Sequence, residues 1–136
     1  MVGKPPTGSA SPAGAPSPNE SKIVVTKTST RFTETSHGFT RGWGVSGKLS
    51  GAKAISMAYG ALPPHLVASP HSHEFDTAIY ILSGRVRAFF GDDLREFVDA
   101  ETGDFLFIPA NLMHGPANLW DKPMTYLVAR ATAIED

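Results

Sequence analysis

From residue 54 onwards the sequence repeats one pattern, a short apolar or alternating run that ends at turn-forming residues. The runs span residues 54–62, 78–82, 86–90, 94–98, 105–108, 115–119 and 124–129. No stretch carries a helical period of apolar residues over about ten positions. Short strands separated by turns at intervals of about 8 to 12 residues are typical of a sandwich or a barrel. The sequence therefore predicts an all-β fold.

Turn residues fix where these predicted strands end. Pro63 and Pro64 end the first run, because proline has no N–H group to donate to a central strand ladder. Residues 91–93 (Gly-Asp-Asp) separate two runs by a tight turn, which predicts a β-hairpin.

The first third of the chain has a different composition. Residues 1–21 are dominated by Pro, Gly, Ser, Ala and Thr, too few apolar groups to offset the entropy of ordering, so we predict a disordered tail. A docking segment is the alternative. Residues 29–51 are rich in Thr, Ser and Gly around Trp43, and the pattern leaves open a lid or a packing arm. The predicted divisions are the tail over 1–21, an N-terminal arm with a first strand at 23–25 over 22–48, and a barrel over 49–134.

Charge and composition exclude several classes of partner and site. The net charge of -1 provides no basic surface for nucleic acid or for an anionic membrane. The absence of cysteine excludes disulfides and thiolate metal sites, so any metal must be bound by nitrogen and oxygen atoms. No apolar run approaches the roughly 20 residues of a membrane helix, and residues 1–20 lack the apolar core of a secretory signal. We therefore expect a cytoplasmic protein.

Two histidines and two carboxylates directly precede the run 78–82. His71 and His73 are two residues apart, so in an extended strand their side chains project from the same face. Glu74 and Asp76 follow within the next three positions. Imidazole and carboxylate groups are ligands of divalent transition metals, and this segment therefore predicts one half of a metal site.

The only histidine further along the chain is His114, and the residues around it carry a family resemblance. Gly103, Pro109, Asn111, His114 and Asn118 have the spacing of the second sequence motif of the cupins, which are small jelly-roll barrels. The single departure is Asn111, where the motif has glycine. Asparagine is the residue that best tolerates the left-handed backbone conformation after glycine, so this departure is mild.

The first cupin motif is matched less completely. It resembles His-x-His followed by three or four residues, a glutamate, six residues and a glycine, and His71, His73 and Gly84 fit it. Counting back from Gly84 puts Thr77 at the position of the glutamate, and Asp76 stands one residue earlier. The match therefore does not decide which residue takes the place of the glutamate in this motif.

The resemblance covers residues 49–130 and implies a double-stranded β-helix, or jelly-roll barrel. The ligand set that it implies is His71, His73, Asp76 and His114, with Glu74 as the backup carboxylate. Three histidines completed by water are the other alternative. Such a set of nitrogen and oxygen ligands suits Fe, Mn, Ni, Co or Zn.

The resemblance also implies a range of functions. A metal ion in a barrel mouth would support a dioxygenase, isomerase, decarboxylase or cyclase reaction on a small oxygenated organic substrate, and the fold does not choose among these reactions. A non-catalytic ligand-binding barrel and a structural cupin with a degraded site are the alternatives. We expect a homodimer.

Other side chains are candidates for contact with the substrate, although the residues that would catalyse a reaction are not identified. The candidates are His65, Tyr80, Phe107 and Met113. A histidine in a loop is commonly only solvated, and aromatic residues in strands are more often part of the core. Substrate contact and these structural roles therefore both stay open. The sequence has no phosphate-binding glycine loop, nucleophile elbow or dinucleotide fingerprint, and we therefore expect no nucleotide cofactor.

Overall fold

The computed structural model of the protein describes residues 22–27, 33–36 and 38–135. The elements within them are β1 (Thr33–Ser36), β2 (Phe39–Val45), α1 (Gly47–Ser50), β3 (Ser56–Leu62), β4 (Thr77–Ser83), β5 (Arg85–Phe90), the 3-10 helix η2 (Asp92–Leu94), β6 (Glu96–Glu101), β7 (Phe105–Ile108), β8 (His114–Ala117) and β9 (Met124–Arg130). The predicted all-β fold is confirmed. The tail predicted over 1–21 lies outside the described residues.

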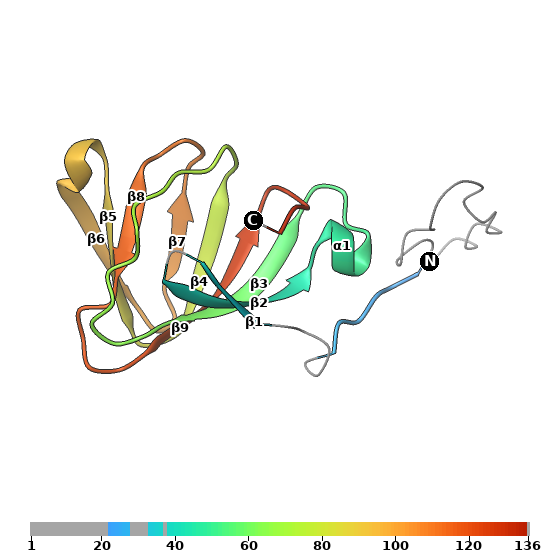
Figure 1. The fold of residues 1–136 in the computed structure, drawn as a ribbon, viewed down its shortest axis with the longest axis horizontal. Coiled ribbons are helices and arrows are strands. Elements are labelled where there is room, and N and C mark those ends of the chain that lie inside the picture. The colour runs from blue at the N-terminus through green and yellow to red at the C-terminus, as the bar shows by residue number, and fades with distance from the viewer. Residues whose placement is uncertain (1–21, 28–32, 37, 136) are drawn as a thin grey trace.

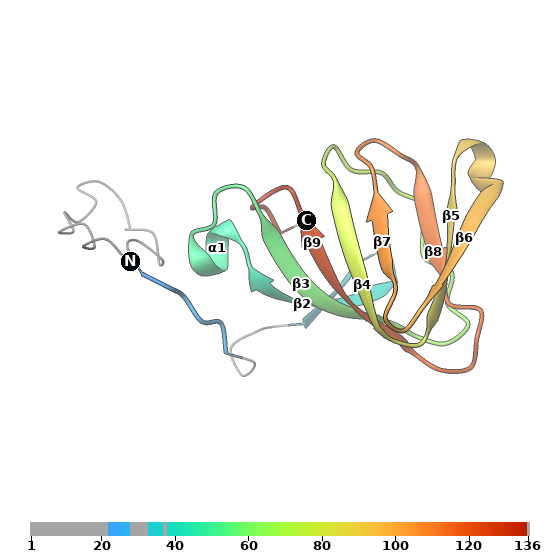
Figure 2. The same ribbon diagram turned by 180° about the vertical axis from the view of Figure 1, so that it is seen from behind.

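The strands form two antiparallel sheets. The larger sheet has the order β1-β2-β3-β9-β4-β7, and the smaller has the order β6-β5-β8. Figures 1 and 2 show the three-stranded sheet at one end of the molecule and α1 at the other. The last strand, β9, lies between β3 and β4, so the chain returns to the middle of the sheet that it left. This order is the jelly-roll arrangement that the sequence predicts.

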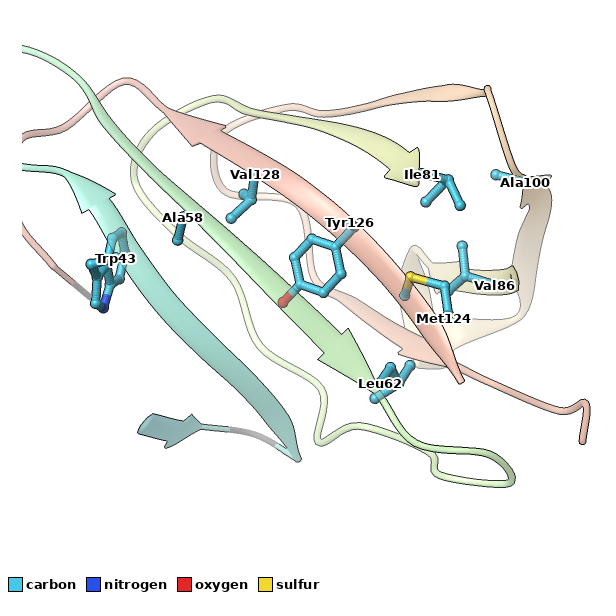
Figure 3. Close-up of a cluster of buried hydrophobic side chains, with 9 residues drawn as sticks. All are labelled: Trp43, Ala58, Leu62, Ile81, Val86, Ala100, Met124, Tyr126 and Val128. Atoms are coloured by element: carbon cyan, nitrogen blue, oxygen red, sulfur yellow. The ribbon is translucent and has the colours of Figure 1, made fainter. Parts of the chain in front are cut away.

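Alternation along the strands places the core between the two sheets. In β3 the residues at even positions, from 56 to 62, are buried, while Met57 and Tyr59 are exposed. The buried apolar cluster consists of Trp43, Ala58, Leu62, Ile81, Val86, Ala100, Met124, Tyr126 and Val128 (Figure 3). Trp43 is 1% exposed, and removal of a side chain of this size from a core costs about 3–5 kcal/mol.

Within residues 29–51, which the sequence left open as a lid or a packing arm, the described strands belong to the larger sheet. Residues 33–36 and 39–45 form β1 and β2, and Trp43 packs in the core, which supports a packing role rather than a lid. Ser46 caps α1 because its Oγ accepts a hydrogen bond of 3.1 Å from the Leu49 N–H. The first strand predicted at 23–25 is not formed, and Ile23 is almost fully exposed. No helix of the described residues is long and apolar enough to cross a membrane.

Glycine is required at Gly84, where β4 turns into β5. Its φ of +84° is left-handed, and a Cβ atom there would lie 2.5 Å from the carbonyl oxygen of Pro123. At Asn111 the backbone φ is +68°, the left-handed conformation that the sequence predicts for this asparagine. The turn at Asn111 brings the chain from β7 back to His114.

Candidate metal centre

His71, His73 and His114 come together between the two sheets. One ring nitrogen from each of them lies within 4.8 Å of the other two. His114 is the first residue of β8, and its backbone forms an isolated antiparallel bridge with His71. The ring centroids of His71 and His114 are 4.4 Å apart, and those of His71 and His73 are 5.1 Å apart. The fold therefore assembles the three imidazoles that the two sequence motifs predict.

Hydrogen bonds fix the orientation of two of these rings. Nδ1 of His71 lies 2.7 Å from the carbonyl oxygen of Ser69, and Nδ1 of His114 lies 2.8 Å from that of Leu112. Because a carbonyl oxygen only accepts hydrogen bonds, each Nδ1 must carry the proton and donate it. In its neutral form each ring then has its lone pair on Nε2, which is the form in which histidine binds a metal.

The acidic residues take other positions. Asp76 is exposed, and its Oδ1 accepts a hydrogen bond of 3.0 Å from the backbone N–H of Ala110. Glu74 is also exposed. Within the part of the chain that the structure describes, the group that could hold a metal contains three imidazoles and neither of these carboxylates. Asp76 instead links the start of β4 to the turn after β7.

A largely apolar cavity opens beside the three histidines. It encloses about 680 Å³ of space between atoms, a figure that includes its opening to solvent. Its walls are the inward-facing residues of both sheets, among them Ile79, Ile81, Val86, Leu106 and Val128. An ion held by the histidines would therefore face an apolar pocket that opens to solvent.

Comparison with known proteins assigns the family. The family model described as "Cupin domain" matches residues 58–130, which is more than half of the chain. The chain belongs to the cupin domain family. No protein with a curated function matches the sequence of this cupin.

Solved structures share the fold at low sequence identity. A mutant of Bacillus subtilis oxalate decarboxylase is 18% identical, with a TM-score of 0.73 over 84% of this chain and 30% of that one. Lactobacillus farciminis oxalate decarboxylase in a formate complex is 15% identical, with a TM-score of 0.73 over 85% of this chain and 34% of that one. A further Bacillus subtilis oxalate decarboxylase, described for its Mn(II) centres, is 16% identical, with a TM-score of 0.72 over 84% of this chain and 30% of that one. The cupin thus spans about a third of the length of these proteins, and the similarity shows the fold.

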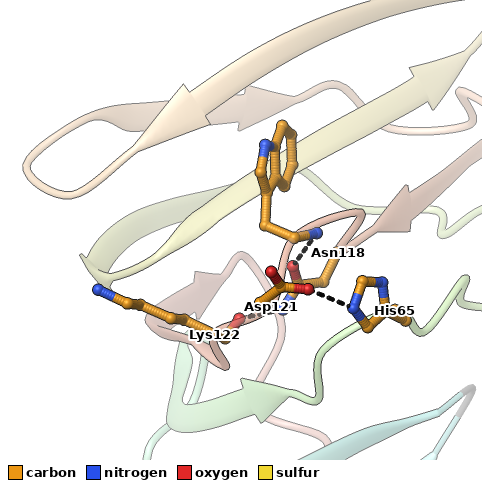
Figure 4. A network of polar contacts seen from close by, with 5 residues as sticks. His65, Asn118, Asp121 and Lys122 are labelled. Atoms are coloured by element: carbon orange, nitrogen blue, oxygen red, sulfur yellow. Dashed lines mark hydrogen bonds and ion pairs between the residues drawn. The ribbon is translucent and has the colours of Figure 1, made fainter.

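His65 lies away from the cavity of this cupin. Its Nε2 is 2.7 Å from Oδ1 of Asp121, and both side chains are largely exposed (Figure 4). Asn118, the last residue of the second motif, is fully buried in the same region and donates to the carbonyl oxygens of Leu62 and Lys122 at 3.1 and 2.7 Å. Asn118 therefore ties the loops together and supplies no ligand atom to the histidine group.

The other three residues predicted to contact the substrate also lie outside the cavity lining. Tyr80 is on the outer face of β4, because strand alternation turns its neighbours Ile79 and Ile81 inward. Phe107 is 64% exposed on the outer face of β7, and Met113 is 46% exposed in the loop before β8. The structure does not bring these three side chains, or His65, to the cavity.

Sequence reasoning missed four polar residues of the cavity. They are Arg41, Thr77, Tyr126 and Arg130. Burial raises the pKa of Tyr126 to about 12, while the nearby charges of Arg41 and Arg130 act in the opposite direction. Tyr126 lies in the predicted strand over 124–129, at a spacing of two from Met124 and Val128, which indicates that the three share one face. Arg41 has the same spacing from Phe39 and Trp43, in a segment where no strand was predicted.

Proposed function

We propose that this cupin is a metal-dependent enzyme that binds a divalent transition metal through Nε2 of His71, His73 and His114. The observation that carries the proposal is the pair of hydrogen bonds from Nδ1 of His71 and His114 to backbone carbonyl oxygens. These bonds hold the rings in the tautomer that binds a metal before any ion is present. Preorganised ligands lower the cost of ordering the site on binding.

Three imidazoles suit Fe, Mn, Ni, Co or Zn, and they leave coordination positions open for substrate or water. When bound, the ion would supply a Lewis acid that polarises an oxygen of the substrate. The protein's own contribution would be to orient the imidazoles, exclude water with the apolar wall and hold the substrate in the cavity. The proposal takes the alternative of three histidines and water, because neither Asp76 nor Glu74 belongs to the histidine group.

The substrate class proposed is a small oxygenated organic molecule, and the reaction is of the dioxygenase, isomerase, decarboxylase or cyclase type. An apolar pocket that opens to solvent beside open coordination positions supports this class. We also keep the prediction of a cytoplasmic location, which cell fractionation would test.

A second copy of the chain is the partner that we propose. The outer face of the larger sheet carries two apolar rows that the strand register defines. The rows are Met57, Ala129, Ala78 and Phe107, and Tyr59, Leu127, Tyr80 and Phe105. Six of these eight side chains are exposed, and Leu127 and Tyr80 are half-buried. An apolar face of this kind is typical of a protein interface. Pairing of two such faces would form a homodimer.

Binding without turnover is the second candidate function, and one observation favours it. Apart from the histidines, Tyr126 is the only described cavity residue that could act as a general base, and its pKa of about 12 keeps it protonated at neutral pH. A ligand that binds to the metal-loaded protein and stays chemically unchanged after long incubation would support this function.

Metal analysis followed by a turnover assay tests the proposed enzyme. Wild-type protein should bind one divalent ion per chain, the double variant His71→Ala/His114→Ala should bind none, and the surface control His65→Ala should match wild type. The loaded protein is then assayed for oxygen uptake and product formation with diketones, hydroxy acids and phenols. Equal metal content in the wild type and the double variant would overturn the metal site.

A further inference from the structure

The ring of Phe75 lies against the ring of His73. Their centroids are 4.9 Å apart and their planes differ by 18°, so the two rings stack face to face. Both residues are half-buried, whereas Glu74 between them is exposed, so the two rings are turned toward the interior. The chain bends at Glu74 and Phe75. This bend brings the rings closer than the roughly 6.5 Å between alternate residues of a straight strand.

Main-chain hydrogen bonds hold both ends of the segment that carries Phe75. The carbonyl oxygen of His73 accepts a hydrogen bond of 2.6 Å from the N–H of Asn111, in the turn after β7. The carbonyl oxygen of Asp76 accepts one of 3.1 Å from the N–H of Ala131, directly after β9. The backbone position of Phe75 is therefore set by these two contacts and not by an ion at the histidines.

Phe75 lies behind His73 rather than in the wall of the cavity. His73 is among the described residues that line the cavity, and Phe75 is not. Cζ of Arg130 lies 5.6 Å from the centroid of the Phe75 ring, within the range of a cation–π contact. This second contact restricts the ring of Phe75. A change at Phe75 therefore acts on a bound ion through the imidazole of His73.

We propose that Phe75 is a positioning residue, which holds the imidazole of His73 in the plane from which Nε2 binds the metal. Nδ1 hydrogen bonds orient the rings of His71 and His114, and the stack on Phe75 orients the ring of His73. Rotation of the imidazole about its Cβ–Cγ bond would tilt it away from the face of Phe75 and lose this contact. The effect on metal binding rests on the function proposed above, whereas the order of the His73 ring in metal-free protein does not.

The stack also favours the metal-bound form of His73 by electrostatics. An imidazole that shares its lone pair with a divalent ion becomes more positive, and the face of an aromatic ring is negative. The contact with Phe75 is therefore stronger in the loaded protein than in the metal-free protein. Stacked aromatic pairs of this kind correspond to about a two- to tenfold change in affinity.

Three variants separate the aromatic ring of Phe75 from its apolar volume. Phe75→Leu removes the aromatic face and keeps an apolar side chain, and Phe75→Tyr keeps the ring. The matched control is Phe97→Leu in the smaller sheet, where Phe97 pairs with Phe89 at a centroid distance of 5.8 Å. Circular dichroism establishes that each variant is folded.

The first readout is the order of the histidine rings in metal-free protein, measured by carbon-13 relaxation of labelled histidine. We expect the ring of His73 in wild type to be as ordered as those of His71 and His114. In Phe75→Leu the order parameter of His73 should fall, while those of His71 and His114 stay unchanged. Phe75→Tyr should restore the wild-type value.

The second readout is Zn²⁺ affinity, measured by competition with a chelating dye. Phe75→Leu should bind Zn²⁺ about two- to tenfold more weakly than wild type. Phe75→Tyr should stay within about twofold of wild type, and Phe97→Leu should match it. Recovery by tyrosine distinguishes a role of the aromatic face from a general loss of packing.

Two results would overturn the role of Phe75. One is a His73 ring that is as ordered in Phe75→Leu as in wild type, and the other is equal Zn²⁺ affinity in Phe75→Leu and Phe75→Tyr. If Phe75→Leu does not fold, wild type decides, because a His73 ring more mobile than those of His71 and His114 contradicts the proposal. Wild-type protein that binds no Zn²⁺ would overturn the proposed function instead, and a His73 ring that loosens only in Phe75→Leu would still support its positioning by Phe75.

Discussion

The backbones of His71 and His114 donate to each other through two hydrogen bonds, from each N–H to the other carbonyl oxygen, both of 2.9 Å. This reciprocal pair joins the first histidine motif to the second, and it fixes the Cα positions from which both rings extend. The Nδ1 bonds to Ser69 and Leu112 then fix the rings themselves. The geometry of the site is therefore set by main-chain contacts, which do not depend on a bound ion.

Removal of the nearby carboxylates should leave metal binding intact. Asp76→Asn and Glu74→Gln keep the shape of the side chains and remove their charge, and neither residue belongs to the histidine group. We expect both variants to bind one Zn²⁺ per chain with an affinity within a few-fold of wild type, measured by competition with a chelating dye. A loss of a hundredfold or more in either variant would place a carboxylate on the metal.

Gly84 and Gly103 allow a matched test of a steric contact. Both have left-handed backbones, with φ of +84° and +92°, but only a Cβ at Gly84 would meet Pro123, whereas nothing lies within 4 Å of one at Gly103. Gly103→Ala should cost about 1 kcal/mol from backbone strain alone. Gly84→Ala should cost at least about 1–3 kcal/mol more, measured by urea unfolding, because of overpacking. Equal losses would contradict the close contact with Pro123.

The buried hydroxyl of Tyr126 should make stability depend on pH in the alkaline range. Its pKa is about 12 in the folded protein, whereas a tyrosine in the unfolded chain ionises near 10. The unfolded chain loses this proton first, so the contribution is fully present below pH 10 and is lost as the pH rises towards 12. We expect wild type to lose about 2–3 kcal/mol more than Tyr126→Phe over this interval.

Absorbance at 295 nm provides the independent check on Tyr126. The ionisation of Tyr126 should appear near pH 12 in the folded protein and be missing from the titration of Tyr126→Phe. A difference between wild type and Tyr126→Phe that appears near pH 10, while the protein remains folded, would contradict the burial of the Tyr126 hydroxyl.

The apolar outer face of the larger sheet predicts self-association. Phe105 and Phe107 are 78% and 64% exposed on β7, at the end of the two apolar rows. We expect a dimer by size exclusion with light scattering, and a monomer for Phe105→Glu/Phe107→Glu, because two buried charges oppose pairing. Phe97→Glu, on the smaller sheet, is the control and should remain dimeric. A wild-type monomer at high protein concentration would rule out this interface.

Particular residues show how far the sequence predicts this fold. The strand over Phe105–Ile108 was predicted to the residue because an apolar run lies between turn residues. β1 and β2 were missed, because residues 33–45 carry many small and polar side chains. In β2 the inward face also includes Arg41, a charged residue that apolar periodicity cannot assign to an interior.

Prediction of the candidate metal centre from the sequence has the same limit. The spacing of His71 and His73, with the motif ending at His114, predicts the three imidazoles because i and i+2 share a strand face. The orientation of the Asp76 side chain depends on its hydrogen bond with the N–H of Ala110. These residues are 34 positions apart, so local sequence spacing does not predict the bond. Tyr80 was expected near the cavity, but the inward face of β4 carries Thr77, Ile79 and Ile81, and the sequence alone did not assign this face.

Nitrogen NMR of ¹⁵N-histidine-labelled protein tests the central claim most directly. On addition of one equivalent of Zn²⁺, the account predicts that the Nε2 signals of His71, His73 and His114 shift to metal-bound positions. The Nδ1 signals of His71 and His114 should remain those of protonated nitrogens, and His65 should not change. Coordination through Nδ1 of His71 or His114, or a spectrum in which these three histidines do not respond to Zn²⁺, would contradict it.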